Sequence, residues 1–212
     1  MASKNSSEIP EDTYVELIEA TISAVYETGY ADLGVRDIDA KFSKSRQLIH
    51  HYFDGKDELI TELLVYLLSD EHEEIASSMD ADPLTKLNAE LDNILLSTYM
   101  DDDEFWKVFT VVYEIQAQAH HNAEHQRLLN ELTDEYVAHL SEILQDGIDE
   151  GIFDDVNPQQ IAMLINDLIA GAHIRKIHLG QDEAPGNARE TIDQLIVSRL
   201  LVNSSTDTMS GI

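Results

Sequence analysis

The sequence predicts an all-α protein, and two observations carry that prediction. Apolar residues recur every three or four positions in segment after segment, which is the spacing of one face of an α-helix. Glycine and proline are scarce, at 9 and 4 of 212 residues, and no alternating strand pattern of useful length appears. We therefore expect about nine helices in two domains.

Capping and turn residues separate the expected helices. Asp82-Pro83 and Asn157-Pro158 each pair a capping side chain with a proline suited to a first helical turn. Gly151 follows a helix end, and 181–187 with its Pro-Gly pair indicates a loop. Residues 1–10 and 203–212 are polar, and we expect disordered tails there. The expected helices cover 11–28, 35–42, 45–52, 56–78, 83–100, 102–120, 124–150, 158–180 and 188–202.

The stretch 35–53 has the pattern of a DNA-binding helix-turn-helix. Apolar residues at helical spacing define a first short helix at 35–42, a polar break follows at 43–45, and Ile49 and Phe53 anchor a second helix. The opposite face of the second helix offers hydrogen-bond donors, a planar amide and an aliphatic tip, the groups that contact base edges in a major groove. These residues are Arg46, Gln47, Leu48, His50 and His51.

Five short motifs follow one another in the first third of the chain: Gly29-Tyr30, Val35 to Ile38, Ser45-Arg46, His50 to Phe53 and Lys56 to Leu59. In order and spacing they resemble the N-terminal domain of the TetR (tetracycline-repressor) family of transcription regulators. The rest matches that family only in helical layout. Ser43 and Lys44 depart from the pattern, which has a glycine and an apolar residue there; glycine is the cheapest residue for a left-handed turn, so the turn geometry stays open.

The resemblance implies a ligand-responsive regulator, more a repressor than an activator. Such a protein binds a palindromic double-stranded DNA operator as a homodimer and is released by a small-molecule effector. Residues 11–55 would form the DNA-binding domain, and 56–202 the ligand-binding and dimerisation domain. Helices 158–180 and 188–202 would pair with their copies, because the first is apolar nearly all round; the alternative is that both finish a monomer core.

Two sets of DNA contacts are expected. Base edges would be contacted by Arg46, Gln47, Leu48 and His51. A second set would bind phosphates, and Lys56, at a helix start, would also aim backbone N–H groups at a phosphate by family analogy. The phosphate set is Arg36, Lys44, Ser45, His50 and Lys56.

The net charge of -29 and pI near 4.3 are unusual for a nucleic-acid binder. We interpret the acidity as the surface of a halophile's protein, whose self-repulsion is screened in molar salt; an ordinary acidic protein is the alternative. Lys86 is the only lysine or arginine between 57 and 106. The locally basic stretch is 35–56, with Arg36, Lys41, Lys44, Arg46 and Lys56.

Candidate effector contacts are polar or aromatic groups that interrupt apolar helix faces. His139 lies within such a stripe, whereas Glu114 points away from one and is expected to be a solvated charge. The aromatic candidates would also serve as plain core, and Asn166 with Asp167 would either bind a cationic or hydroxylated ligand or hold each other across a dimer. The candidates are Tyr99, Trp106, Phe109, Tyr113, Gln116, His139, Asn166 and Asp167.

Other chemistries find little support. The chain has no cysteine, and no apolar run approaches the length of a membrane span, so we expect a cytoplasmic protein without cofactor or bound metal. His121 and His125 share an i, i+4 spacing, but we expect a solvated turn there. A metal-dependent helical enzyme and a ligand carrier or scaffold that has lost DNA binding are the alternatives to a regulator.

Overall fold

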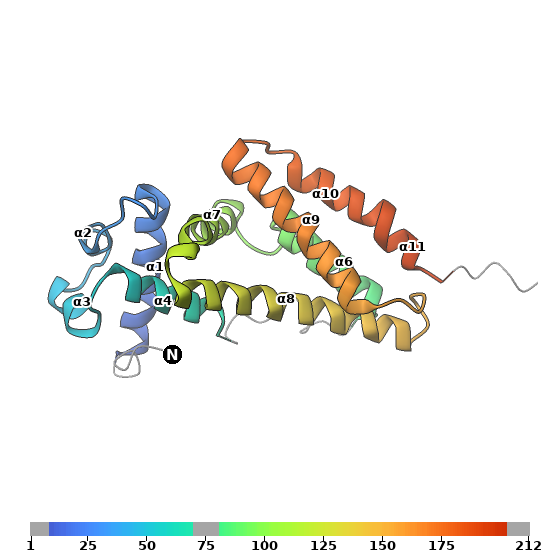
Figure 1. Cartoon of the computed structure of the whole chain (residues 1–212), viewed down its shortest axis with the longest axis horizontal. Coiled ribbons are helices and arrows are strands. Elements are labelled where there is room, and N and C mark those ends of the chain that lie inside the picture. Colours follow the sequence, from blue (N-terminus) through green and yellow to red (C-terminus); the bar gives the residue numbers. More distant parts are fainter. Residues whose placement is uncertain (1–8, 70–80, 203–212) are drawn as a thin grey trace, which may run out of the picture. The chain divides into compact units, whose positions relative to one another are not determined.

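The computed structural model describes residues 9–69 and 81–202, except for the side chain of Arg46. Within these residues the fold is all-α, as predicted, and the last three helical segments run on as one helix (Figure 1). The elements are α1 (Glu11–Thr28), α2 (Val35–Asp39), α3 (Arg46–Tyr52), α4 (Lys56–Leu67), α6 (Pro83–Leu96), α7 (Asp102–Gln118), η2 (Ala119–His121), α8 (Ala123–Asp149), α9 (Pro158–Leu179), α10 (Ala184–Ile192), η3 (Asp193–Val197) and α11 (Ser198–Leu200). Residues 1–8 and 203–212 of the predicted tails, and most of helix 56–78 beyond Leu67, lie outside the described residues. The predicted disorder was wrong for Ile9, which is buried in the core, and for Pro10, which directly precedes α1.

The described chain forms two compact units. Unit 1 comprises residues 9–69 and 101–134, and unit 2 comprises 81–100 and 135–202. Helix α8 therefore belongs to unit 1 in its first half and to unit 2 in its second. The expected boundary at residue 55 divides the chain by function rather than by packing, and it stays a prediction.

In unit 1, α1 contacts α2, α4 and α7 around an apolar core. Ile38 of α2, Ile49 of α3 and Leu59 of α4 are each at most 1% exposed. Burying one such side chain contributes about 1.5–3 kcal/mol. Helices as short as α2 and α3 are unstable alone, so this burial holds them in place.

In unit 2, helix α6 begins at the predicted cap but ends earlier than predicted. The Asp82 carboxylate accepts a hydrogen bond from the Thr85 N–H (3.0 Å), and Pro83 occupies the first turn. Ser97 ends the helix in a left-handed conformation with φ 51°. The predicted end at residue 100 was wrong because serine carries no strong stop signal, and only its backbone conformation marks the end.

The last helix begins before its predicted start at residue 188. Helix α10 starts at Ala184, and Pro185 lies in its first turn. A proline is well placed there, because the missing N–H would have no partner within the helix. The predicted loop at 181–187 is therefore wrong in its second half, where the Pro-Gly pair was mistaken for a turn.

The segment between α8 and α9 closes the core of unit 2 against Gly147. A Cβ at Gly147 would lie 2.1 Å from Cδ2 of Phe153, so only glycine lets the buried ring pack so closely on α8. The end of the last helix is tied to this segment. The Asp154 N–H donates to the Leu200 carbonyl (2.7 Å), and the Val202 N–H donates to the Ile152 carbonyl (3.0 Å).

Candidate nucleic-acid interface and effector region

Helix α3 presents an exposed polar face opposite a buried apolar one. Ser45 caps it by accepting a hydrogen bond from the Gln47 N–H (3.2 Å). Ile49 and Phe53, 1% and 3% exposed, face the core. The opposite side exposes Gln47, His50 and His51, while Leu48 is half-buried against the core.

The turn between α2 and α3 is completed by a side chain from α1. Ser43 donates its backbone N–H to Oε1 of Glu16 (2.9 Å). Among the described residues other than glycine, only Ser97 has a positive φ, so Ser43 needs no left-handed conformation. The turn accommodates serine in place of glycine because it needs no positive φ, and Glu16 accepts a hydrogen bond from the Ser43 N–H.

The lysines around α3 already hold partners. Lys44 Nζ lies 3.3 Å from Oδ2 of Asp12 and 3.4 Å from Oε2 of Glu16, and it donates to Oγ1 of Thr13 (2.5 Å). Lys56 Nζ donates to the backbone carbonyl of Tyr30 (3.2 Å) and lies 5.0 Å from the centre of its ring. The expected phosphate-binding lysines are thus engaged within the chain.

Arg36 differs from these lysines. Its side chain is exposed, and no described residue forms an ion pair with it. The backbone of Arg46 opens α3, but its side chain lies outside the described structure. Arg36 is therefore the expected phosphate contact with the most accessible charge in the described part of the chain.

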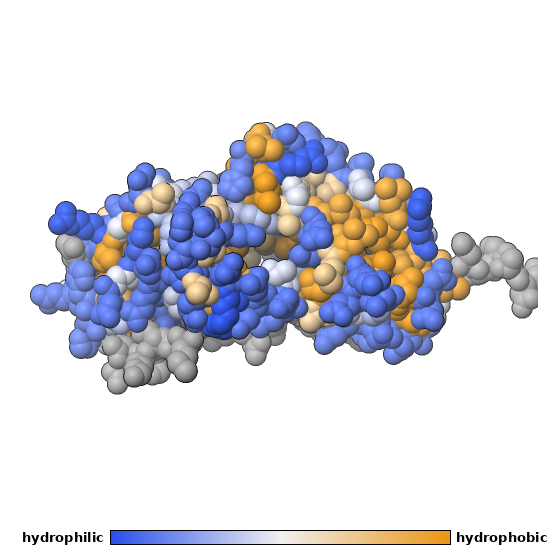
Figure 2. All heavy atoms as spheres, viewed as in Figure 1, coloured by the Kyte–Doolittle hydropathy of each residue, from blue (hydrophilic) through white to orange (hydrophobic). Residues whose placement is uncertain are grey.

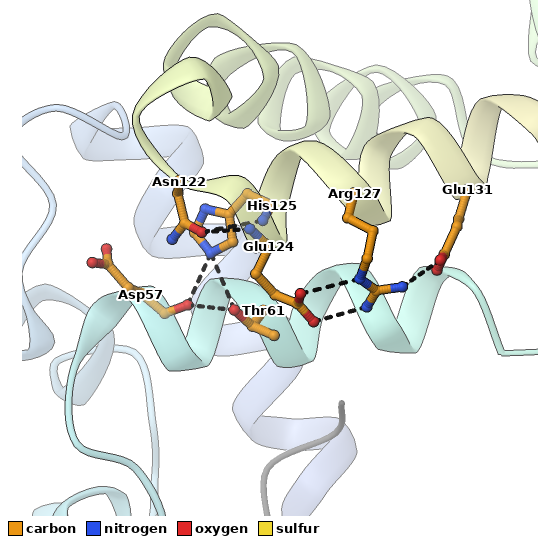
Figure 3. A network of polar contacts seen from close by, with 7 residues as sticks. All are labelled: Asp57, Thr61, Asn122, Glu124, His125, Arg127 and Glu131. Atoms are coloured by element: carbon orange, nitrogen blue, oxygen red, sulfur yellow. Dashed lines mark hydrogen bonds and ion pairs between the residues drawn. The ribbon is translucent and has the colours of Figure 1, made fainter.

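A polar network joins the starts of α4 and α8 within unit 1 (Figure 3). His125 Nε2 lies 3.0 Å from the Asp57 carbonyl oxygen and 3.1 Å from Thr61 Oγ1. Asn122 caps α8 by accepting a hydrogen bond from the His125 N–H (3.2 Å). The predicted solvated turn was wrong for His125, which is 1% exposed, although His121 is exposed. The i, i+4 spacing could not show that the second histidine faces α4.

Four effector candidates lie on α7 in unit 1, where they do not share one buried face. Gln116 is exposed, and Tyr113 is half-buried, with burial raising its pKa to about 12. Trp106 donates its ring N–H to Oδ1 of Asp102 (3.0 Å) and lies against Phe109 with ring centres 6.4 Å apart. The face of α7 that packs into the core carries Val111 and Ile115 instead.

Glu114 corrects the expectation of a solvated charge. Its side chain is half-buried, and Oε2 accepts a hydrogen bond from the Tyr30 N–H (3.3 Å). That N–H lies just beyond the C-cap of α1 at Gly29, so Glu114 accepts a hydrogen bond from a backbone donor outside the helix. The helical wheel of α7 alone could not reveal this partner from another element.

The remaining candidates lie in unit 2. His139 on α8 is 7% exposed, and its Nε2 lies 3.2 Å from Oε1 of the equally buried Glu90 on α6. Tyr99 and Asp167 are exposed, and Asn166 is half-buried. Only His139 among these four is buried with a charged partner.

Sequence reasoning missed Glu90 and its neighbours. Glu90 lies three residues after Leu87 and four before Ile94, on the apolar face of α6, which was an available signal. Oδ1 of Asn93, three residues further on, is buried without a hydrogen-bond partner among the described residues. His173 of α9 is also buried, and its Nε2 donates to the Ile94 carbonyl (2.8 Å). Unit 2 thus contains a polar cluster inside an apolar core.

Apolar side chains also gather on the surface of unit 2 (Figure 2). Met163, Leu164 and Ile174 project from one side of α9 with 52%, 48% and 41% of their surface exposed, and Leu195 of the last helix is 53% exposed. Asp167 and Gly171 lie on the same side of α9 at helical spacing. None of the described helices is long and apolar enough to cross a membrane.

Metal chemistry has no support in the described residues. No group of three or more histidine or carboxylate side chains there is arranged to hold an ion. The His120 and His121 rings lie with their centres 3.7 Å apart and their planes tilted by 43°, but His125 points into the contact with α4.

Comparison with known proteins identifies two family matches. Residues 17–63 match a model described as bacterial regulatory proteins, tetR family, and residues 86–201 match one described as BetI-type transcriptional repressor, C-terminal. Together they cover well over half of the chain. No curated protein matches it.

Solved structures agree with these matches. A TetR transcription regulator from Haloarcula marismortui is 28% identical, with 90% of this chain and 100% of that chain covered and a TM-score of 0.80. A regulator from Saccharomonospora viridis in complex with choline is 17% identical, with 88% and 98% covered and a TM-score of 0.74. Reduced NemR from E. coli is 16% identical, with 85% and 96% covered and a TM-score of 0.70. The last two likenesses concern the fold alone.

Proposed function

We propose that this chain, which belongs to the TetR family of transcription regulators, is a repressor that binds a palindromic DNA operator as a homodimer and is released by a small-molecule effector. One observation carries the proposal: α3 is anchored by Ile49 and Phe53 and leaves Gln47, His50 and His51 exposed. A helix anchored on one face and polar on the other suits insertion into a major groove.

Two roles follow for the side chains near α3. Gln47 and His51, with Arg46 and the tip of Leu48, would contact base edges, and a bidentate amide or guanidinium distinguishes base pairs. Arg36, Lys44, Ser45, His50 and Lys56 would contact phosphates, which position the protein without reading sequence.

Binding titrations on an operator selected from random duplexes test this division. Gln47→Ala should cost about 1–3 kcal/mol on the operator and relax preference at particular base pairs. Arg36→Ala is the matched comparison, because loss of a phosphate contact should weaken operator and random duplex alike and lower the salt slope by about one. Equal losses for Gln47→Ala on both duplexes would remove base reading from α3. If the variants bound DNA like the wild type, the DNA-binding surface would lie elsewhere, and a wild type that bound no DNA would favour the ligand carrier.

Dimerisation is assigned to the exposed apolar side of α9 together with the last helix. Met163, Leu164, Ile174 and Leu195 would be covered by a second copy, and Gly171 would let the two α9 helices approach closely. A two-fold axis would place the two α3 helices about 34–36 Å apart, one turn of DNA. Asp167, exposed on this side, would then face the partner rather than an effector.

The effector is assigned to the polar cluster of unit 2. Glu90 and Asn93 share one face of α6, and Tyr136 and His139 share one face of α8. A buried carboxylate beside an amide oxygen favours a ligand that is positively charged or carries hydrogen-bond donors. The choline bound to the Saccharomonospora viridis regulator is a cation of this kind.

The route from effector to DNA would run along α8. That helix is continuous from His139 to His125, and His125 contacts the first turn of α4, which follows α3 in the chain. An effector that prefers one position of α4 would change the separation of the two recognition helices.

Thermal unfolding in the presence of ligand tests the effector assignment. Choline should raise Tm in a concentration-dependent way, and 3,3-dimethylbutan-1-ol, its neutral isostere, should do so much less. Glu90→Gln keeps the shape of the side chain but removes the charge, so it should remove the difference between the two ligands. A choline response that survives Glu90→Gln would place the cation elsewhere.

A further inference from the structure

The ammonium group of Lys44, an expected phosphate contact, already forms ion pairs with two carboxylates of the same chain. Lys44 directly precedes Ser45, the N-cap of α3. Its Nζ lies 3.3 Å from Asp12 and 3.4 Å from Glu16, both on α1. Lys41, three residues earlier, is held in the same way by Glu27 (2.6 Å). Two of the five basic residues of the stretch 35–56, Lys41 and Lys44, are thus neutralised by carboxylates of the same chain.

The carboxylates that hold Lys44 are ionised at neutral pH. Hydrogen bonding from Lys44 lowers the pKa of Asp12 below its ordinary value, and hydrogen bonding from Ser43, followed by Lys44, lowers that of Glu16. Asp12 is 80% exposed at its side chain, so its ion pair is open to exchange with another anion. Glu16 is less exposed, at 28%, and also completes the turn through Ser43.

We propose that Asp12 and Glu16 are internal competitors of DNA phosphate for Lys44, so that contact with DNA at this position is an exchange of ion-pair partners. The proposal rests on the proposed function, since it concerns how the same surface binds DNA. DNA binding by itself does not require that carboxylates of the chain compete with phosphate.

The exchange changes how binding depends on salt. A free lysine that neutralises a phosphate releases a condensed cation, and each such contact steepens the decline of affinity with salt by about 0.9 in log–log slope. When Lys44 leaves Asp12 and Glu16, the two carboxylates attract cations again, which offsets that release. The contact between Lys44 and a phosphate therefore adds little to the salt dependence of DNA binding. The competing carboxylates also lower the affinity for DNA in dilute salt.

Two double variants on α1 separate this exchange from simple charge effects. Asp12→Asn with Glu16→Gln removes both competitors, and the amide oxygen introduced by Glu16→Gln can still accept a hydrogen bond from the Ser43 N–H. Glu11→Gln with Glu19→Gln makes the same charge change on the same helix, at exposed residues that form no ion pair with any described residue. Circular dichroism and melting temperature confirm folding, and Asp12→Asn alone repeats the test in a chain whose turn is untouched.

Fluorescence anisotropy with a random duplex of about 30 base pairs across a KCl series is the readout. Asp12→Asn/Glu16→Gln should bind roughly three- to tenfold tighter in dilute salt, since each exposed ion pair is worth at most about fivefold. Its salt slope should steepen by about 0.5–1. Lys44→Ala should then cost more affinity in that background than in the wild type, a coupling that a double-mutant cycle measures.

The outcomes distinguish this inference from the proposed function. An unchanged slope, or an equal change with Glu11→Gln/Glu19→Gln, overturns the exchange while wild-type binding upholds DNA recognition. A wild type that binds neither this duplex nor a selected operator overturns both. A steeper slope only in the Asp12→Asn/Glu16→Gln variant, lost again with Lys44→Ala, establishes the exchange.

Discussion

His173 shows how a single buried residue links the stability of unit 2 to pH. Its side chain is fully buried, and its Nε2–H donates to the Ile94 carbonyl (2.8 Å). Burial lowers its pKa from 6.5 to about 4, against a smaller opposing effect of the hydrogen bond. The folded protein therefore keeps this histidine neutral at a pH where the unfolded chain protonates it.

Stability should accordingly fall as pH drops from about 6.5 to about 4, because only the unfolded chain takes up the proton in that window. The full difference corresponds to on the order of 3 kcal/mol. His173→Gln retains an amide donor for the Ile94 carbonyl but does not titrate. Urea unfolding of both proteins at about pH 7 and about pH 4.5, at fixed salt and protein concentration, should show the wild type losing more stability than the variant.

Equal losses in the two proteins would show that His173 does not carry this part of the acid sensitivity. The carboxylates provide an internal reference, because their contribution to acid unfolding is common to both proteins.

At the residue scale, the sequence predicts what depends on one helix face and misses what depends on a second element. Ile49 and Phe53 could be assigned to the core because helical spacing alone puts them there. The partners of Glu114 and His125 could not, since Tyr30 and Thr61 come from elsewhere in the chain. A helical wheel carries no information about which neighbour a polar side chain meets.

At the scale of elements, the sequence predicts helix starts better than helix ends. Asp82-Pro83 and Asn157-Pro158 predict the starts of α6 and α9, because each pairs a capping side chain with a proline that suits the first turn. The end of α6 is set by the left-handed backbone conformation of Ser97. The start of α10 was missed because Pro185 can belong to a turn or, as it does here, to the first turn of a helix. Both depend on backbone conformation, which packing decides.

The proposed homodimer should dissociate when the exposed side of α9 is given additional charges. Ile169 is buried in the core of unit 2 and Leu168 packs against that core, so a charged residue at either position would unfold the protein. Leu164→Glu with Ile174→Glu should instead give a folded monomer at micromolar concentration, because two carboxylates would be buried against their copies. Light scattering measures the mass, and circular dichroism confirms that the helices persist.

A dimer of unchanged mass in that variant would remove this side of α9 from the interface. Glu190→Gln, at an exposed residue of α10, is a control for expression and handling.

At the scale of the whole molecule, the most unusual property is the net charge of -29. The chain carries 42 acidic against 13 lysine and arginine residues. Repulsion among so many carboxylates destabilises a compact state unless salt screens it. A surface suited to high salt therefore stays a prediction from this charge balance.

Raising KCl from dilute to multimolar concentration should therefore increase both helical circular dichroism and Tm. At about 1 M salt the screening length falls to about 3 Å, so most of the repulsion between separate carboxylates is lost. A matched series in sucrose, which strengthens burial without screening charge, isolates the ionic contribution. Full stability in dilute buffer would contradict the high-salt interpretation.

The interleaving of the two units along the chain has a consequence during synthesis. Helix α6 buries Leu87, Leu91 and Leu95 against residues as late as Leu200, which is made 105 residues after Leu95. A ribosome adds about 5–20 residues per second, so Leu200 is synthesised roughly 5–20 s after Leu95. During this time the apolar face of α6 cannot be fully buried. Unit 1 needs nothing beyond residue 134 and can close first. Nascent unit 2 is therefore the part of the protein that a chaperone would have most time to shield.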